Sequence, residues 1–449
     1  MRISRIFLIF GTASLCVASA VPRSSKPHSS FKRSDNATNP MFQLSTDADF
    51  NFEILRVLSM APYEGADIGE VLVAAKEIEP GDFESFYNGF NNLALRAEKI
   101  ARAIDPRRHP VSARNALFKL SNYYRSADFF LHGNWSDPRI NALWEKQLSA
   151  FNDAMALMTV PGERITIHAK DGGFDIPAIF FGTGLPGRRP TLIACNGYDG
   201  SQEEMYHVIG QAALQRGMNF IAYEGPGQPT VRREQNLGFI PEWEKVVSPV
   251  IDYALERPEV DGDAIALMGF SFGGYLVPRA AAFDHRAAAI MAVDGIYDFG
   301  QSILKHLPEE LQQIFSSGDA EKFNAILSKV IADPTTVTSF RWGVQQGSWA
   351  LKAKTPFEFM TKAQAYNLTG LTDKITTPVF VGDAQLDGFF LGQGKELADH
   401  IGGMTTYHQF EAIDGAGEHC AIGATVYQNQ VLLDWFEDII HQPKNCIRP

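Results

Sequence analysis

The stretch that decides the fold is Ala264-Ile265-Ala266-Leu267-Met268, followed directly by Gly269-Phe270-Ser271-Phe272-Gly273. The first five residues are apolar and predict a buried strand, and a helical pattern starts after the serine. The serine therefore lies in a sharp turn, with a glycine two residues away on each side to permit close backbone approach. A serine that projects above the end of a strand is typical of a catalytic nucleophile, and we predict that role for Ser271.

The sequence on both sides of this turn alternates between apolar strands and helical stretches. This alternation predicts the α/β class, with a mostly parallel sheet flanked by helices, and the serine turn favours the α/β-hydrolase fold within that class. Two β-rich runs joined by Asp171-Gly172-Gly173 predict an antiparallel hairpin at the sheet edge. The expected strands are residues 164–168, 176–181, 191–195, 219–223, 264–268, 287–293, 378–381 and 405–410.

Two helical regions are added to the predicted sheet. Between residues 45 and 160 apolar side chains recur at spacings of three and four, as at Phe86, Phe90 and Leu93, which predicts an N-terminal helical domain. Residues 161–449 are then expected to form the catalytic domain. A mainly helical stretch at about 298–372 is too long for an ordinary connection between strands, and it predicts an inserted lid.

The N-terminus has the composition of a secretory leader. Basic residues precede an apolar stretch that ends at Ala18-Ser19-Ala20, so residues 1–20 predict a cleaved signal peptide. Residues 21–44 predict a linker, and Lys32-Arg33 within it resembles a processing site that would end a pro-segment. We therefore expect the protein outside the cell or in the lumen of a secretory vesicle.

Sequons and cysteines fit this route. Three Asn-X-Ser/Thr triplets mark candidate glycosylation sites at Asn36, Asn134 and Asn367. Three cysteines remain after removal of the leader, and an odd number predicts no disulfide framework. A bridge between Cys420 and Cys446 stays open as an alternative.

The charge and the motifs exclude several classes of partner. A formal net charge of −12 and the lack of a basic tract argue against nucleic acid and anionic membranes. The turn at residues 224–228 lacks the lysine of a phosphate loop, and the cysteine spacings match no metal site, so we expect no cofactor and no metal. The expected partner is a small apolar or aromatic molecule. We expect no stable membrane anchor, and a homodimer is one alternative for the oligomeric state.

A serine hydroxyl is a weak nucleophile and needs a base and an acid, which follow in this fold in the order Ser, Asp or Glu, His. His419 lies beyond the last predicted strand in a glycine-containing turn, and we predict it as the base. Asp387, in the loop after the strand 378–381, is the preferred acid because its carboxylate can orient the imidazole. Asp383, nearer that strand, and Asp294, after the preceding strand, remain alternatives.

The negative charge that develops on a substrate oxygen needs two backbone N–H donors, which form an oxyanion hole. One comes from the residue after the nucleophile, here Phe272, and the other from an early loop between a strand and a helix. The loop Asn196-Gly197-Tyr198-Asp199-Gly200 fits the second place, with Tyr198 preferred and Gly197 next. The alternative is that this loop is an ordinary glycine turn.

These motifs resemble a family of fungal hydrolases that act on polyketide intermediates. Members include the yellowish-green pigment hydrolase and hydrolases of fusarin and cytochalasan clusters, and the bacterial 2,6-dihydroxypseudooxynicotine hydrolase is similar. The resemblance is carried by residues 121–128, 196–200, 224–228, 269–275, 294–298, 341–343 and 415–420. It implies a triad of Ser271, Asp387 and His419 and, for some members, cleavage of a carbon–carbon bond beside a ketone. Many members of this family lack a secretory leader, so the substrate of this protein can differ from theirs.

The leading hypothesis is a secreted serine hydrolase that cleaves a ketone or an ester in a polyketide-derived pigment or mycotoxin. One alternative is a secreted nutritional esterase or peptidase, which needs an open cleft for polymeric substrates. Another is a non-catalytic binding module on a hydrolase fold. That alternative predicts that a triad residue is missing, whereas all three positions are filled.

Overall fold

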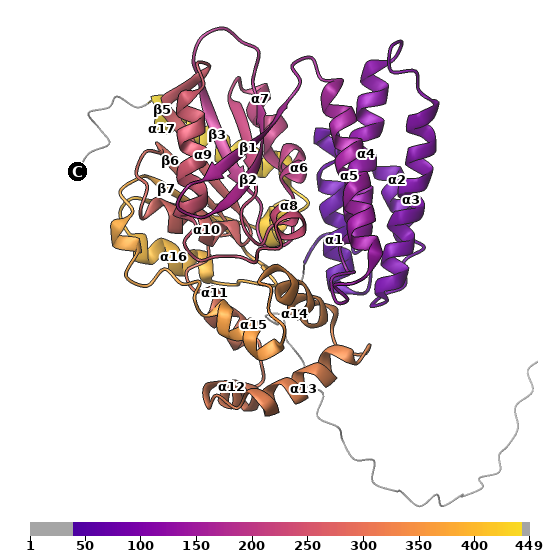
Figure 1. Cartoon of the computed structure of the whole chain (residues 1–449), viewed down its shortest axis with the longest axis vertical. Coiled ribbons are helices and arrows are strands. Elements are labelled where there is room, and N and C mark those ends of the chain that lie inside the picture. Colours follow the sequence, from indigo (N-terminus) through magenta and orange to yellow (C-terminus); the bar gives the residue numbers. More distant parts are fainter. Residues whose placement is uncertain (1–38, 442–449) are drawn as a thin grey trace, which may run out of the picture. The chain divides into compact units, whose positions relative to one another are not determined.

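An eight-stranded sheet organises the chain from Glu163 to Phe410 (Figure 1). The computed structural model describes residues 39–441. The strand order is β1-β2-β4-β3-β5-β6-β7-β8; β1 and β2 run antiparallel to their neighbours and the remaining pairs are parallel. The strands are β1 (Glu163–Ala169), β2 (Phe174–Phe181), β3 (Arg189–Cys195), β4 (Asn219–Tyr223), β5 (Val260–Phe270), β6 (Ala289–Val293), β7 (Val379–Ala384) and β8 (Thr405–Phe410). This sheet confirms the predicted α/β class and the hairpin at its edge.

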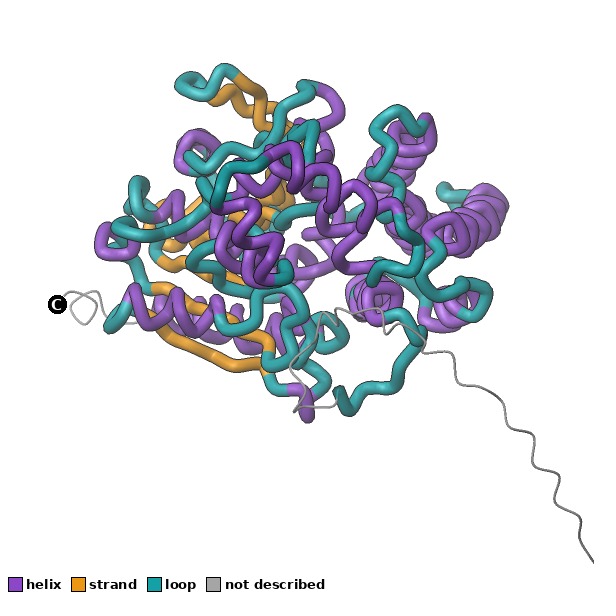
Figure 2. The backbone as a smooth tube through the Cα atoms, turned by 90° about the horizontal axis from the view of Figure 1, so that it is seen from below, coloured by secondary structure: helices purple, strands orange, loops and turns teal. Residues whose placement is uncertain are grey.

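Side chains of the central strands alternate between two apolar layers. On β3, Ile193 packs into one layer and Leu192 into the other. Helices cover both faces, and in Figure 2 the orange strands lie together with purple helices around them. The helices are α9 (Glu244–Glu256), α10 (Gly273–Ala281) and α16 (Gln393–Ile401) on the first face, and α7 (Gln211–Gln215) and α17 (Thr425–His441) on the second. Burial on both faces explains why the central strands are continuous apolar runs.

Within the described residues, five α-helices precede the sheet and form a bundle with its own apolar core. They are α1 (Ala48–Ser59), α2 (Ile68–Ala75), α3 (Phe83–Ala103), α4 (Pro110–Asp128) and α5 (Pro138–Ala156). Side chains of Asp47, Asp82 and Asp137 accept hydrogen bonds from backbone N–H groups in the first turns of α1, α3 and α5. Such caps satisfy donors that have no partner inside the helix, so they fix where these helices begin.

The bundle shares an apolar layer with the sheet domain. Phe118 on α4 stacks on Tyr206 with ring centroids 5.0 Å apart, and Phe151 on α5 lies 6.1 Å from the same ring. Tyr206 begins the π-helical turn Tyr206–Gly210, which separates α6 (Gln202–Met205) from α7. The helical bundle is therefore packed directly against the segment that follows β3.

A second helical region lies between β6 and β7. It contains α11 (Phe299–Lys305), α12 (Glu309–Ser316), α13 (Ala320–Ala332), α14 (Thr338–Ala350) and α15 (Pro356–Ala363). Trp342 on α14 stacks on Phe129 at the end of α4, with ring centroids 4.8 Å apart. The insertion thus contacts the bundle as well as the sheet domain.

Several predictions concern residues outside the described range. These are the signal peptide 1–20, the Lys32-Arg33 site, the sequon at Asn36 and the Cys446 end of the bridge considered with Cys420. Within residues 39–441, no helix combines the length and apolarity that a membrane span needs.

Candidate active site

Ser271 lies at the junction of β5 and α10, where the chain leaves the sheet. Its φ of 61° is in the left-handed region, which side chains other than glycine rarely adopt. The turn is also tight: a Cβ on Gly269 would lie 1.8 Å from the carbonyl oxygen of Gly273. Only glycine at position 269 allows this approach, which explains the residue spacing in the motif.

The structure brings His419 and Asp387 to this serine. His419 Nε2 lies 2.8 Å from Ser271 Oγ, and His419 Nδ1 lies 2.9 Å from Asp387 Oδ2. The second carboxylate oxygen of Asp387 accepts hydrogen bonds from the backbone N–H groups of Phe389 and Phe390, at 2.7 and 3.0 Å. These bonds fix the carboxylate with Oδ2 facing the imidazole, as orientation of a general base requires.

A second carboxylate meets the same ring nitrogen. Asp294, which follows β6, places Oδ2 3.0 Å from His419 Nδ1. Its side chain also accepts hydrogen bonds from the backbone N–H groups of Ala384 at 3.1 Å and Cys420 at 2.6 Å. Asp383 instead accepts a hydrogen bond from the Tyr407 hydroxyl at 2.7 Å. Two of the three candidate acids therefore reach the imidazole, an arrangement that reasoning from the sequence did not foresee.

The carboxyl groups of Asp294 and Asp387 differ in their pKa values. Burial and the adjacent Asp387 carboxylate raise the pKa of Asp294 to about 7. Burial acts in the same direction on Asp387, but the charge of His419 and the hydrogen bonds outweigh it, and the pKa of Asp387 lies below its usual value. Like charges this close cannot both ionise easily, so Asp387 carries the charge near neutral pH while Asp294 retains much of its proton.

The loop between β3 and α6 packs directly against the nucleophile turn. A Cβ on Gly197 would lie 2.6 Å from the backbone nitrogen of Phe272. The Gly197 N–H donates to Asn196 Oδ1 at 2.8 Å, so this amide is already engaged. Among the described residues, no acceptor is paired with the amides of Tyr198 and Phe272. These two amides fit an oxyanion hole, in which the donors must be available to substrate.

Three aromatic rings lie close to the imidazole of His419. Ring centroids of Phe389, Phe390 and Phe52 lie 5.1, 5.6 and 6.2 Å from that of His419. Phe52 belongs to α1, and Trp342 of the inserted helices lies 6.3 Å from Phe389. The helical bundle and the insertion thus both contribute apolar surface at the site.

The remaining predicted sites lie elsewhere on the protein. Asn134 is exposed, whereas Asn367 is half-buried and donates through Nδ2 to the Gln364 carbonyl oxygen at 3.3 Å.

Three side chains at the active site are of types that can bind a metal ion. Asp294, His419 and Cys420 each have one atom of a kind that can ligate a metal, and these three atoms lie within 4.8 Å of one another. Both ring nitrogens of His419 are already hydrogen-bonded, which fits a proton-transferring triad rather than a metal centre.

No protein-family model matches the chain. The chain is 30% identical to the 20-hydroxy-prefusarin hydrolase FUS2 of Gibberella moniliformis over 407 residues, which is 86% of this chain and 96% of the relative. It is 35% identical to the α/β-hydrolase psoB of Aspergillus fumigatus over 335 residues, 71% of this chain and 74% of that protein. The chain belongs to this family of α/β-hydrolases.

The fold agrees with this assignment. The solved 2,6-dihydroxy-pseudo-oxynicotine hydrolase superposes with a TM-score of 0.65 at 19% identity, covering 86% of this chain and 96% of that one. The resemblance inferred from the motifs is confirmed, and the chain is a hydrolase of the α/β-hydrolase fold.

Substitution of each candidate aspartate by asparagine tests which one acts as the charged partner of His419. We expect Asp387→Asn to lower kcat by about 10³- to 10⁴-fold, because the charged partner of the imidazole is lost. Asp294→Asn should cost less than about tenfold, because a neutral amide resembles the protonated carboxyl that this site favours. Asp383→Asn is the control and should leave kcat unchanged. Steady-state ester hydrolysis measures all three, and a larger loss in Asp294→Asn than in Asp387→Asn would reverse the assignment.

The pH profile tests the charge of the imidazole. Burial tends to lower the pKa of His419, but Asp387 and the hydrogen bonds raise it well above 6.5. A protonated imidazole cannot accept the Ser271 proton, so kcat/KM for an uncharged ester should rise with pH through an apparent pKa above 6.5. Stopped assays across the neutral range measure this, and an acidic limb centred at or below 6.5 would contradict the expected electrostatics.

Proposed function

We propose that Ser271, His419 and Asp387 are a catalytic triad that cleaves a small, apolar, polyketide-derived ketone or ester. The observation that carries the proposal is the continuous hydrogen-bonded series from Asp387 through His419 to Ser271, with 2.9 and 2.8 Å between the paired atoms. The similarity to a hydrolase named for 20-hydroxy-prefusarin supports the substrate class. The aromatic rings around His419 support an apolar substrate.

The first half of the proposed reaction forms an acyl-enzyme. His419 Nε2 takes the proton of Ser271 Oγ as the oxygen attacks the substrate carbonyl carbon. The carbonyl oxygen gains the negative charge and accepts hydrogen bonds from the amides of Phe272 and Tyr198. When the tetrahedral intermediate collapses, the bond to the leaving group breaks, and His419 returns its proton to that group.

Cleavage of an ester and cleavage of a ketone differ in the leaving group. An ester releases an alcohol, whose oxygen receives the proton from His419. A β-dicarbonyl substrate releases an enolate, and protonation at carbon completes the cleavage of the carbon–carbon bond. In both cases His419 then deprotonates a water molecule that attacks the acyl-enzyme, and a carboxylic acid leaves Ser271.

A nutritional esterase or peptidase is less compatible with this site. His419 is 5% exposed, and aromatic side chains from the bundle and from the insertion lie around it. A polymer needs an open cleft along which it can extend, whereas a small apolar molecule fits among such rings. A non-catalytic role is disfavoured because the three triad side chains are already in hydrogen-bonding positions.

A matched pair of substrates tests this proposal. An aryl ester and a β-diketone with the same apolar acyl group should both release the same carboxylic acid, and Ser271→Ala should lower either rate by at least about 10⁴-fold. Product analysis by mass spectrometry in ¹⁸O-labelled water should find one label in the acid. Turnover of the ester alone would restrict the activity to esters, and turnover that survives Ser271→Ala would exclude the triad.

We also propose that the protein follows the secretory route and is glycosylated at Asn134. The leader at residues 1–20 and the exposed position of Asn134 support this proposal. Protein secreted from a eukaryotic host should lose mass on treatment with an N-glycosidase, and Asn134→Gln should remove part of that loss. Asn367→Gln is the comparison, because its side chain is half-buried. Protein retained in the cytosol and unaffected by the glycosidase would contradict both parts.

A further inference from the structure

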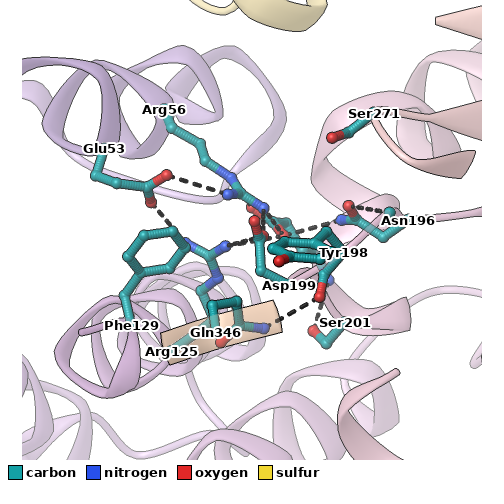
Figure 3. A network of polar contacts seen from close by, with 12 residues as sticks. Glu53, Arg56, Arg125, Phe129, Asn196, Tyr198, Asp199, Ser201, Ser271 and Gln346 are labelled. Carbon is teal, nitrogen blue, oxygen red and sulfur yellow. Dashed lines mark hydrogen bonds and ion pairs between the residues drawn. The ribbon is translucent and has the colours of Figure 1, made fainter. Parts of the chain in front are cut away.

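The loop that carries the Tyr198 amide is held by a buried network of charged and polar side chains. Figure 3 shows this network between α1, α4 and the loop, with Ser271 beside Asn196. Two arginines from the helical bundle supply its positive charge: Arg56 on α1 and Arg125 on α4. Their side chains are 7% and 6% exposed, so the ion pairs are removed from water.

Both arginines converge on Asp199, the residue after Tyr198. Asp199 Oδ1 lies 2.9 Å from Arg56 Nη2 and 3.2 Å from Arg125 Nη2. Glu53 joins the two guanidinium groups on their other side, at 3.2 Å from Arg56 Nη1 and 3.1 Å from Arg125 Nη1. A planar guanidinium can bond two carboxylates in fixed directions at once, which an ammonium cannot do.

A second branch of the network reaches the amide before Tyr198. Arg56 Nε donates to Glu204 Oε1 at 2.7 Å. Glu204 Oε2 accepts a hydrogen bond from Asn196 Nδ2 at 3.0 Å, and Asn196 Oδ1 accepts one from the Gly197 N–H at 2.8 Å. The Gly197 amide is therefore turned toward Asn196, and the next amide along the chain, that of Tyr198, is left for a substrate oxygen.

The loop is also held from the insertion and from the sheet domain. Gln346 on α14 donates through Nε2 to the Tyr198 carbonyl oxygen at 3.0 Å. Gln228 donates through Nε2 to the Asn196 carbonyl oxygen at 2.6 Å. Three parts of the fold thus meet at one loop, and the two arginines that contact Asp199 both come from the helical bundle.

A gain in folding stability does not explain why these ion pairs are buried. Burial of ion pairs costs desolvation that their attraction barely offsets, and apolar side chains of similar volume often serve as well. Burial also raises the pKa of Glu53, which shows how costly the charge is there. What ion pairs supply better than apolar contacts is direction, and direction is what an oxyanion donor requires.

We infer that Arg56 and Arg125 are positioning residues that hold the Asn196–Asp199 loop so that the Tyr198 amide faces the reacting oxygen. This makes the N-terminal helical bundle part of the catalytic apparatus, in addition to the Phe52 ring that it places 6.2 Å from the His419 ring. The inference rests on the proposed function, because it assigns the Tyr198 amide to the oxyanion hole.

The test compares Arg125→Met with Arg164→Met. Arg164 donates to Glu203 Oε1 at 2.8 Å, so its loss removes an ion pair to α6 at the residue beside Glu204 but leaves the loop contacts intact. With an activated aryl ester, Arg125→Met should lower kcat by about 10- to 100-fold with KM changed less than about twofold. Binding of a trifluoromethyl ketone, which forms the oxyanion, should weaken by a factor similar to the loss in kcat/KM. Arg164→Met should leave both quantities within about twofold of the wild type.

Folding is checked by thermal melting, and Arg125→Lys provides a second variant that keeps the charge. Lysine cannot reach both Glu53 and Asp199 in the guanidinium geometry, so we expect a kcat between those of Arg125→Met and the wild type. Folded Arg125 variants with wild-type kcat and wild-type affinity for the ketone would overturn the inference alone. An equal loss in Arg164→Met, or a rise in KM alone, would overturn it as well. A folded wild-type enzyme that neither turns over the ester nor binds the ketone would overturn the proposed function and the inference together.

Discussion

The left-handed backbone at Ser271 is the constraint on which the geometry of the site depends. A non-glycine residue with φ near 61° costs of order 1 kcal/mol or more, so the surroundings must hold it. They do so from neighbouring strands, because the loop after β3 packs on the turn at Gly197 and the Val293 carbonyl at the end of β6 accepts the Ser271 N–H. Parallel strands thus deliver donor loop, nucleophile and carboxylate to one edge of the sheet.

The same strand order explains the pair of carboxylates. Val293 on β6 is in register with Gly382 on β7, so the residues that follow each strand meet at the same edge. Asp387 accepts two backbone N–H groups and has a pKa below its usual value, whereas the pKa of Asp294 is raised to about 7, so Asp294 is partly protonated near neutral pH. The arrangement stabilises the imidazolium with one full charge.

Much of this architecture could be predicted from the sequence. The apolar run before Ser271 and the glycines around it predict the strand and the turn, and the position of His419 beyond the last strand predicts the imidazole that lies 2.8 Å from Ser271 Oγ. The sequence favoured Asp387 as the acid, but it gave no sign that Asp294 also reaches the imidazole, because these two residues become neighbours only through the strand order. The last helix begins only at Thr425, because Cys420 and Ala421, directly after His419, adopt positive φ values that a continuous helix does not allow.

No sequence pattern indicated the buried network of charged side chains around Arg56 and Arg125. Arg56 and Glu204 lie 148 residues apart, and each reads locally as an ordinary charged residue of a helix. Their pairing is visible only in the folded structure, because it depends on how the bundle packs against the segment after β3. The proposed role of the helical domain therefore depends on tertiary packing, whereas the proposed nucleophile is marked by a local sequence pattern.

The central claim is that Ser271 is activated by His419 in the folded protein. It is tested most directly by reaction with a fluorophosphonate, followed by intact mass measurement and peptide mapping. We expect a single phosphonyl adduct on Ser271 in the folded wild-type protein and no adduct in protein that is unfolded before labelling. Folded wild-type protein in which Ser271 stays unmodified would contradict it.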